Sequence, residues 1–375
     1  APASQVPLAP LTTWKIGGPA EWYAEPKSEA ELRAALEWAG QRRLPVHLLG
    51  RGSNVLIADA GLSGLVVCLR ALRGEGASEP EPDRDGLLTV PAGLSLPRLS
   101  KLAARHGFSG YEFYIGIPGT VGGAAAMNAG FGPGDERQTA ARCREVQVLD
   151  RQGNLEWRPY ADFHPAYRHT DLLRDGGAAV VVRARFFLNQ PASRETIRRE
   201  TAEHLAMRRE RQPLTRPTAG SVFKGTPEGI PAGLLIDRCG LKGFQVGGAA
   251  VSRKHANWIE NLGGATAADV LAVIHHVQEA VERREDRRVD QEHPASMAAC
   301  RARSSTPGSA AGKRRGMSRN APQASRGRPI RSSACPSPSW LSGATGESGK
   351  SRAPIRYCRA ADRKSTRLNS SHTHL

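Results

Sequence analysis

The 375-residue chain has few aromatic residues and few cysteines, and it lacks any long apolar run. Aromatic residues make up 5% of the sequence, and the six cysteines form no C-x-x-C pair, so neither a zinc knuckle nor a dithiol redox centre is expected. The 11 histidines show no ligand spacing, and no metal site is expected. Since no apolar run reaches about 18 residues, we expect no membrane-spanning helix. The first residues lack the features of a secretory signal, which favours a cytoplasmic location.

Acidic residues are scarce at the end of the chain. Residues 293–375 contain 16 Lys and Arg but only two acidic residues, a net charge of +14, whereas residues 1–292 carry +3. The body therefore has no strong excess of basic charge, and nucleic-acid binding is not expected of it. The terminal segment shows no apolar periodicity and cannot bury a core, so the composition predicts a disordered basic tail.

Two further explanations of this tail are open. A basic arm that binds nucleic acid is one, although aromatic residues for base stacking are limited to Trp340 and Tyr357. The other is a reading frame lost shortly after Arg284, because residues 363–372 resemble translated cloning or adapter sequence. The sharp change in composition favours this last explanation.

Apolar periodicity and turn residues predict an α+β body. Ser28 and Glu31 form a capping box before a helix, and Thr266 and Asp269 cap the last helix. Further helices are expected over 97–103, 195–209 and 233–237, and strands over 46–49, 55–57, 146–157 (a hairpin), 179–187, 246–251 and 258–261. A domain boundary is expected near Gln190.

Two glycine-rich loops are the strongest binding signals. A glycine loop alone is as often a tight turn as a ligand site, but two such loops favour a bound pyrophosphate, held by backbone N–H groups. Neither loop matches a known nucleotide fingerprint: Val55 replaces the third glycine of a Rossmann motif, and no Gly-Lys-Ser/Thr follows for a Walker A loop. The candidate cofactor-binding residues are Gly50, Arg51, Gly52, Ser53, Asn54, Gly116, Pro118, Gly119, Thr120, Gly122, Gly123, Asn128, Ala129 and Gly130.

Ser221 is a candidate proton donor because it lies between a glycine, Gly220, and a cationic residue, Lys224. The segment is not a G-x-S-x-G elbow, which argues against a hydrolase nucleophile. Taken alone, Ser221 would more often be a capping or surface serine. Arg168 would similarly be a surface cation unless an anionic substrate group lies nearby.

In this order the motifs resemble the UDP-N-acetylenolpyruvoylglucosamine reductase (MurB) family. The resemblance rests on Thr12–Ala20, the two loops, Tyr167-Arg168, Ala219–Lys224, Ala232–Ile236, Gly240–Gly243 and Ser252–Asn257, and covers about residues 10–284. It implies a two-lobed FAD-binding domain of the vanillyl-alcohol-oxidase-like (PCMH-type) class over residues 10–190. A smaller α+β substrate domain follows over 191–292. The short connection after residue 184 resembles the branch without the tyrosine-bearing substrate loop.

The resemblance also implies the activity of a UDP-N-acetylmuramate dehydrogenase in peptidoglycan synthesis, and hence a part in cell shape and division. NADPH would reduce noncovalently bound FAD, which would pass a hydride from N5 to C3 of the enolpyruvyl ether of UDP-N-acetylglucosamine. Ser221 would protonate C2, Arg168 would stabilise the developing charge, and Glu292 would be a second acid. Arg211 and Lys224 would bind substrate, and the protein is expected to be a monomer.

Two segments depart from the family pattern. Gly225-Thr226-Pro227 stands where the family has Asn-Pro, so a substrate contact is expected to be lost or shifted. The closing segment, Val289–Glu292, matches the family in spacing only. Two alternatives stay open: another FAD-dependent oxidoreductase that acts on a hydroxylated substrate, and a basic nucleic-acid-binding protein.

Overall fold

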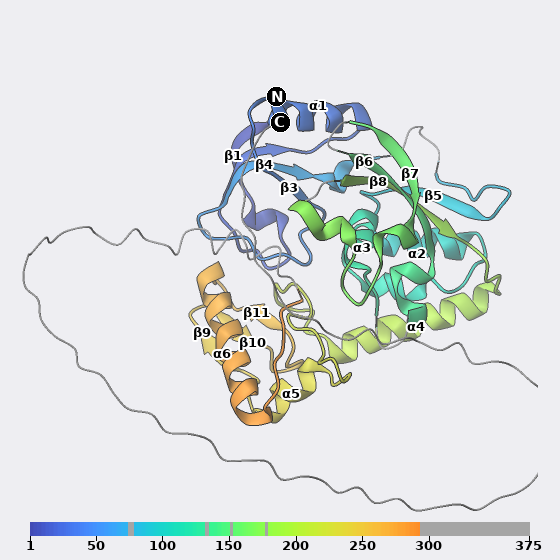
Figure 1. Ribbon diagram of the computed structural model, residues 1–375. Coiled ribbons are helices and arrows are strands. Elements are labelled where there is room, and N and C mark those ends of the chain that lie inside the picture. The colour runs from blue at the N-terminus through green and yellow to red at the C-terminus, as the bar shows by residue number, and fades with distance from the viewer. Residues whose placement is uncertain (74–78, 132–134, 151–152, 177–178, 293–375) are drawn as a thin grey trace, which may run out of the picture. The chain divides into compact units, whose positions relative to one another are not determined.

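The computed structural model describes residues 1–73, 79–131, 135–150, 153–176 and 179–292 (Figure 1). All of these residues lie in one compact unit. The tail over 293–375 lies outside the described residues, and the three explanations for it stay predictions. No helix of the described residues combines the length and the hydropathy that a membrane span requires.

The first half of the chain forms two four-stranded sheets. In the first sheet, β2 and β3 both run parallel to β4, and β1 pairs antiparallel with β2; the order is β1-β2-β4-β3. The second sheet is antiparallel throughout, in the order β5-β8-β6-β7. The strands are β1 (Ala3–Pro7), β2 (Pro19–Ala24), β3 (Val46–Leu49), β4 (Leu62–Cys68), β5 (Leu87–Pro91), β6 (Cys143–Asp150), β7 (Leu155–Pro159) and β8 (Ala179–Phe187).

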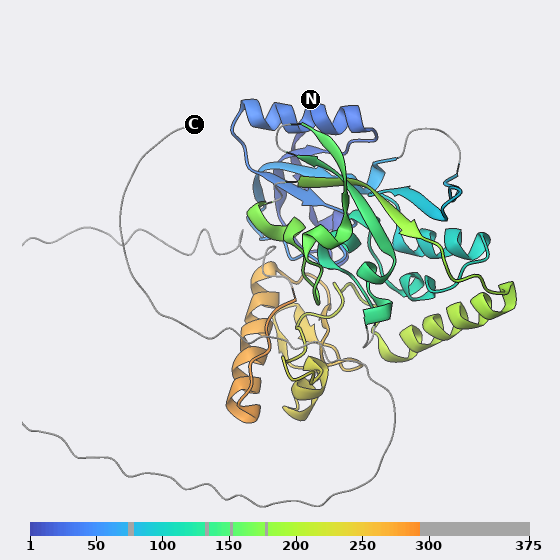
Figure 2. The ribbon, with the colours of Figure 1, turned by 45° about the vertical axis from the view of Figure 1, so that its right-hand side comes forward.

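A large apolar core lies between these strands and three helices. It contains Leu32 of α1, Leu99 of α2, Val121 of α3 and Phe186 of β8, all fully or almost fully buried. The helices are α1 (Glu29–Gln41), α2 (Leu96–Arg105) and α3 (Val121–Met127), and the longer, polar α4 (Arg194–Arg211) then leads to the second half of the unit (Figures 1 and 2). Ser28 caps α1 through its hydroxyl, which accepts a hydrogen bond from Glu31 N. The predicted capping box is only half formed, because the Glu31 carboxylate accepts from Lys27 N at 2.8 Å and not from Ser28 N.

The predicted strand over residues 55–57 is wrong. Leu56 and Ile57 are buried, but no strand forms there. Leu56 packs into the core of the second half of the unit, and Ile57 packs into a separate, smaller apolar cluster. Their run of apolar residues reflects two anchoring contacts and not a pleated segment. The strand that pairs with β3 is β4, which follows later in the chain and runs parallel to it.

The second half of the unit has its own core. It consists of α5 (Ala232–Arg238), α6 (Ala267–Glu285) and a small antiparallel sheet of order β11-β10-β9, formed by Ile259–Asn261, Ala249–Val251 and Gln245–Val246. Residues from the start of the chain complete this core: Trp14 is buried in it, and its indole Nε1 donates to Ile259 O at 2.8 Å. The boundary near residue 190 stays a prediction.

The cap predicted for the last helix is present at the start of α6, where it forms a capping box. Thr266 Oγ1 accepts a hydrogen bond from Asp269 N, and the Asp269 carboxylate accepts one from Thr266 N. A second carboxylate, that of Asp59, accepts hydrogen bonds from Ala267 N and Ala268 N at 2.7 and 3.1 Å. Residues from opposite ends of the unit therefore cap one helix.

Residues beyond Arg284, where the resemblance in sequence becomes weak, still belong to this fold. Val289 is 1% exposed in the second core, and Phe223 and Gln291 form an antiparallel bridge. Two backbone hydrogen bonds flank the bridge, from Lys224 N to Asp290 O and from Glu292 N to Val222 O, both 2.8 Å. These contacts fix Glu292 beside the segment that carries Ser221.

Candidate active site

One large cavity contains almost all of the predicted site residues. Its volume is about 2590 Å³, more than the roughly 300–1,000 Å³ of a pocket for one small ligand. Thirteen of the fourteen cofactor candidates line it, as do Arg168, Arg211, Ser221, Lys224 and Glu292. The exception is Asn128. Within the described residues, no group of three or more His, Cys, Asp or Glu is placed to bind a metal ion.

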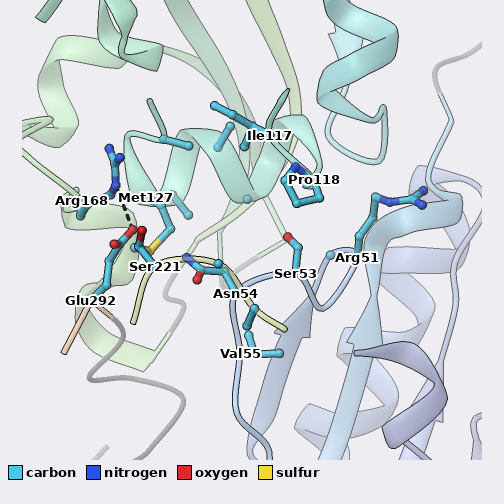
Figure 3. A pocket seen from close by; sticks show the side chains of 18 of the residues that line it. Arg51, Ser53, Asn54, Val55, Ile117, Pro118, Met127, Arg168, Ser221 and Glu292 are labelled. Carbon is cyan, nitrogen blue, oxygen red and sulfur yellow. Dashed lines mark hydrogen bonds and ion pairs between the residues drawn. The ribbon is translucent and has the colours of Figure 1, made fainter. Parts of the chain in front are cut away.

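The first glycine loop, residues 50–54, offers free backbone donors to this cavity. Among the described residues, none accepts a hydrogen bond from the N–H groups of Arg51 to Asn54. Gly52 has φ +61°, and a Cβ at this position would lie 2.2 Å from Leu11 O, so only glycine fits there. Successive N–H groups around a left-handed residue form an anion-binding nest. Figure 3 shows Arg51, Ser53 and Asn54 of this loop at the cavity.

The second loop, residues 116–130, lines the cavity and is tied to the rest of the protein where α3 begins. At the start of α3 the N–H groups of Val121, Gly122 and Gly123 donate to Leu94 O, Ala92 O and Thr120 Oγ1. They are therefore engaged within the protein. The glycines permit close packing instead: Gly122 lies against Ala92, and a Cβ at Gly50 would come within 2.8 Å of Thr120 Oγ1. The two loops thus meet at one wall of the cavity.

Asn128 is buried next to this wall, outside the cavity lining. It is 1% exposed and has φ 42° at the end of α3. Its amide Nδ2 donates to Gln138 Oε1 and Ala166 O, at 2.8 and 3.1 Å, and its Oδ1 accepts from Ala140 N at 2.9 Å. The side chain therefore organises neighbouring loops, including the turn that carries Arg168.

Arg168 and Glu292 form an ion pair inside the cavity. Arg168 Nε donates to Glu292 Oε1 at 2.9 Å, and Arg168 Nη2 donates to Gly130 O at 2.9 Å. Burial raises the pKa of the Glu292 carboxyl above its usual range, and the charges of Arg168 and Lys224 oppose that shift in part. The sequence indicates Arg168 and Glu292 only as separate candidates, whereas in the structure they are in direct contact.

Ser221 lies beside this pair. Figure 3 shows Ser221, Arg168, Glu292 and Met127 close together at one end of the cavity. Gly220, with φ +86°, precedes Ser221, and an isolated antiparallel bridge to Trp258 holds the serine backbone on the second half of the unit. Lys224 and Arg211 line the same cavity, and Arg211 is exposed where α4 ends.

The segment that replaces Asn-Pro forms a closed loop. Thr226 N donates to Ile230 O at 2.9 Å, and Ile230 N donates to Thr226 Oγ1 at 3.2 Å. Thr226 is 7% exposed, and Gly225, Thr226 and Pro227 all line the cavity. The departure from the family pattern therefore lies in the cavity wall. The neighbouring backbone hydrogen bonds of Val222 with Glu292 and of Lys224 with Asp290 are intact.

Several cavity residues were missed at the sequence level. Arg208 of α4 lies against Gly116, with its Cδ 3.7 Å from the position of a Cβ there, and burial lowers the pKa of its guanidinium. His255 also lines the cavity, and burial and the charge of Lys242 lower the pKa of its imidazole. The sequence gives no signal for these two residues, because their burial depends on tertiary packing.

The geometry fits a large dinucleotide cofactor, and comparison with known proteins agrees. A model of the FAD binding domain matches residues 20–157, and a model of the UDP-N-acetylenolpyruvoylglucosamine reductase C-terminal domain matches residues 212–293. UDP-N-acetylenolpyruvoylglucosamine reductase of Parasynechococcus marenigrum (strain WH8102) is 45% identical over 282 residues, covering 74% of this chain and 90% of the relative. The chain belongs to this family.

Other relatives agree with this membership. The reductase of Synechococcus sp. (strain WH7803) is 43% identical over 274 residues, covering 73% of this chain and 86% of the relative. The crystal structure of UDP-N-acetylenolpyruvylglucosamine reductase (MurB) from Thermus caldophilus has a TM-score of 0.63 and 37% identity, covering 78% of this chain and 97% of that one. The predicted α+β fold with an FAD-binding domain, and FAD as cofactor, are confirmed.

Proposed function

We propose that this protein uses NADPH and FAD to reduce the enolpyruvyl ether of UDP-N-acetylglucosamine to UDP-N-acetylmuramate. Membership of the reductase family supports this, as does the convergence of Ser221, Arg168 and Glu292 at one end of the cavity. That convergence carries the proposal, because the reaction requires a proton donor and a cation at adjacent substrate atoms. When bound, FAD would accept a hydride from NADPH and supply one to C3 of the substrate.

Arg168 is suited to binding the carboxylate of the enolpyruvyl group. A guanidinium has five N–H donors, and the two contacts to Glu292 and Gly130 occupy two of them. Three N–H groups therefore have no partner among the described residues and could bind an anion. As negative charge develops at C2 and spreads into the carboxylate, a cation already held in place stabilises it without reorganisation.

Ser221 is the proposed proton donor to C2. An alcohol is a weak acid, so its alkoxide needs a cation nearby. Arg168 and Lys224 supply positive charge to this end of the cavity. Glu292 is the proposed second acid, since burial favours its protonated form and a neutral carboxyl can donate a hydrogen bond.

The first loop is the proposed site for the cofactor's pyrophosphate. Its free N–H groups, from Arg51 to Asn54, and its left-handed Gly52 support this assignment. For the second loop we propose contact through its cavity-facing residues, Gly116, Pro118, Gly119, Ala129 and Gly130 among them. Arg211 and Lys224 would bind substrate, Arg211 at the diphosphate.

Anaerobic spectroscopy tests the proposal. NADPH should bleach the flavin of the purified protein, and the enolpyruvyl nucleotide should restore the yellow colour with formation of UDP-N-acetylmuramate. A flavin that stays bleached after the nucleotide is added would contradict the proposal. The second candidate, an oxidase of a hydroxylated substrate, would instead reduce its flavin with an alcohol and reoxidise it with oxygen.

In this role the protein would serve peptidoglycan synthesis and, through it, cell shape and division. The cytoplasmic location and the monomeric state expected from the sequence stay predictions. So does the division into an FAD-binding domain over 10–190 and a substrate domain over 191–292. The two larger cores support the division. The first lies before the boundary, and the second lies after it except for a few residues from the start of the chain.

A further inference from the structure

Tyr167 lies next to Arg168 in the chain, and its ring also lies beside the guanidinium. Arg168 Cζ is 4.9 Å from the centroid of the Tyr167 ring. A cation within about 6 Å of an aromatic centroid is attracted by the negative face of the ring. Tyr167 is 51% exposed yet lines the cavity, so the apolar core does not account for its position.

The backbone beneath this contact is firmly held. Ala166 N donates to His169 O at 2.9 Å and His169 N donates to Ala166 O at 3.2 Å, closing a tight turn around Tyr167 and Arg168. Thr170 Oγ1 donates to Ala126 O at 2.7 Å and so ties the end of the turn to α3. Arg168 has φ 54°, a left-handed conformation that is strained for a residue with a side chain.

A fixed backbone does not by itself fix a guanidinium at the end of a long, flexible stem. Glu292 and Gly130 each hold one edge of the group through a single hydrogen bond. Both contacts lie in or near the plane of the guanidinium, since N–H donors point outward within that plane. The contact with the Tyr167 ring is of another kind, because the ring attracts the positive charge of Arg168 without a hydrogen bond.

We propose that Tyr167 is a positioning residue, whose ring holds the Arg168 guanidinium so that its free N–H groups meet the substrate carboxylate. This inference rests on the proposed function for its effect on the reaction. The phenolic hydroxyl has no part in it, because the attraction arises from the ring. Tyr167→Phe should therefore preserve the effect, and Tyr167→Leu should remove it while keeping an apolar side chain of similar bulk at a half-exposed position.

Rapid mixing of the full-length holoenzyme measures the effect on the reaction. After anaerobic reduction by NADPH, Tyr167→Leu should be reoxidised by the enolpyruvyl nucleotide about 2–10-fold more slowly than the wild type, whereas reduction by NADPH should be unchanged. Tyr167→Phe should restore the rate. As a matched control, Phe187→Leu removes another such pair, in which Arg144 Cζ lies 4.8 Å from the ring, outside the cavity lining. A wild-type rate in Tyr167→Leu would overturn the inference.

A second measurement needs no substrate and follows the position of Arg168 directly. Infrared titration of the Glu292 carboxyl, assigned by its loss in Glu292→Gln, reports how closely the cation approaches. Burial raises the pKa of this carboxyl, and the positive charges of Arg168 and Lys224 lower it. Looser placement of Arg168 should raise the pKa of Glu292 in Tyr167→Leu but not in Tyr167→Phe.

The two measurements separate failure of this inference from failure of the proposed function. An unchanged pKa of Glu292 in Tyr167→Leu would overturn the positioning role, whatever the reaction. A wild-type flavin that the nucleotide cannot reoxidise would contradict the proposed function, and the titration would still decide whether Tyr167 holds Arg168.

Discussion

At the scale of single residues, the ionisation of Glu292 is set by burial against two cations. Burial raises the pKa of this carboxyl above that of the unfolded chain, so the folded protein binds a proton more readily. The resulting stabilisation is complete below the unfolded pKa, near 4.5, and is lost as the pH rises through the raised folded pKa. The difference in stability between the wild type and a variant without this carboxyl should therefore depend on pH.

We predict that wild-type stability falls relative to that of Glu292→Gln as the pH increases from about 4.5 to 7. The Gln variant has no proton to lose at this position and provides the reference. Chemical denaturation of both proteins at the two pH values measures the difference. A difference independent of pH would mean that the pKa of Glu292 is not raised.

At the scale of elements, the start of α6 joins distant parts of the chain. Asp59 is an exposed carboxylate that accepts hydrogen bonds from two N–H groups of this helix. Carboxylates at helix N-termini stabilise through these bonds and through the helix dipole. Asp59→Ala should lower the free energy of unfolding by about 0.5–2 kcal/mol.

A surface aspartate provides the control for that substitution. Asp162 lies 3.8 Å from Arg158 in an exposed ion pair, so Asp162→Ala should change the stability by less than about 0.5 kcal/mol. Urea denaturation compares the three proteins. Equal stability of Asp59→Ala and wild type would show that the contact with α6 contributes nothing.

Local signals predicted these elements to different degrees. The capping residues Ser28 and Thr266 each mark a real helix start, because capping is a contact between near neighbours. The pairing of β3 with β4 escaped prediction, since a parallel pair is fixed by distant residues. The same reason hid the contact of Arg168 with Glu292, 124 residues apart, although both had been chosen as candidates.

At the scale of the whole molecule, the contacts of Glu292 show that the fold and the site need the chain at least as far as this residue. Val289 packs in the second core and Glu292 reaches Arg168, so residues 286–292 contribute to both stability and the site. A chain ending at Glu292 should bind FAD as tightly as the full chain. A chain ending at Glu285 should be less stable and should lose most of its activity.

Flavin fluorescence titration and thermal denaturation of the three chain lengths test this expectation. The chain ending at Glu285 should be less stable and less active than the chain ending at Glu292. The chain ending at Glu292 should match the full chain. Tighter FAD binding by the full chain than by the chain ending at Glu292 would assign a part to the basic tail, whose charge of +14 sets it apart from the body.

The central claim is that one cavity brings a seryl hydroxyl to the atom that must be protonated. Single-turnover reoxidation of the NADPH-reduced Ser221→Ala enzyme by the enolpyruvyl nucleotide tests it most directly. The account predicts that NADPH reduces this variant at the wild-type rate and that reoxidation is slower by ~10²-fold or more. Reoxidation at the wild-type rate would contradict the account.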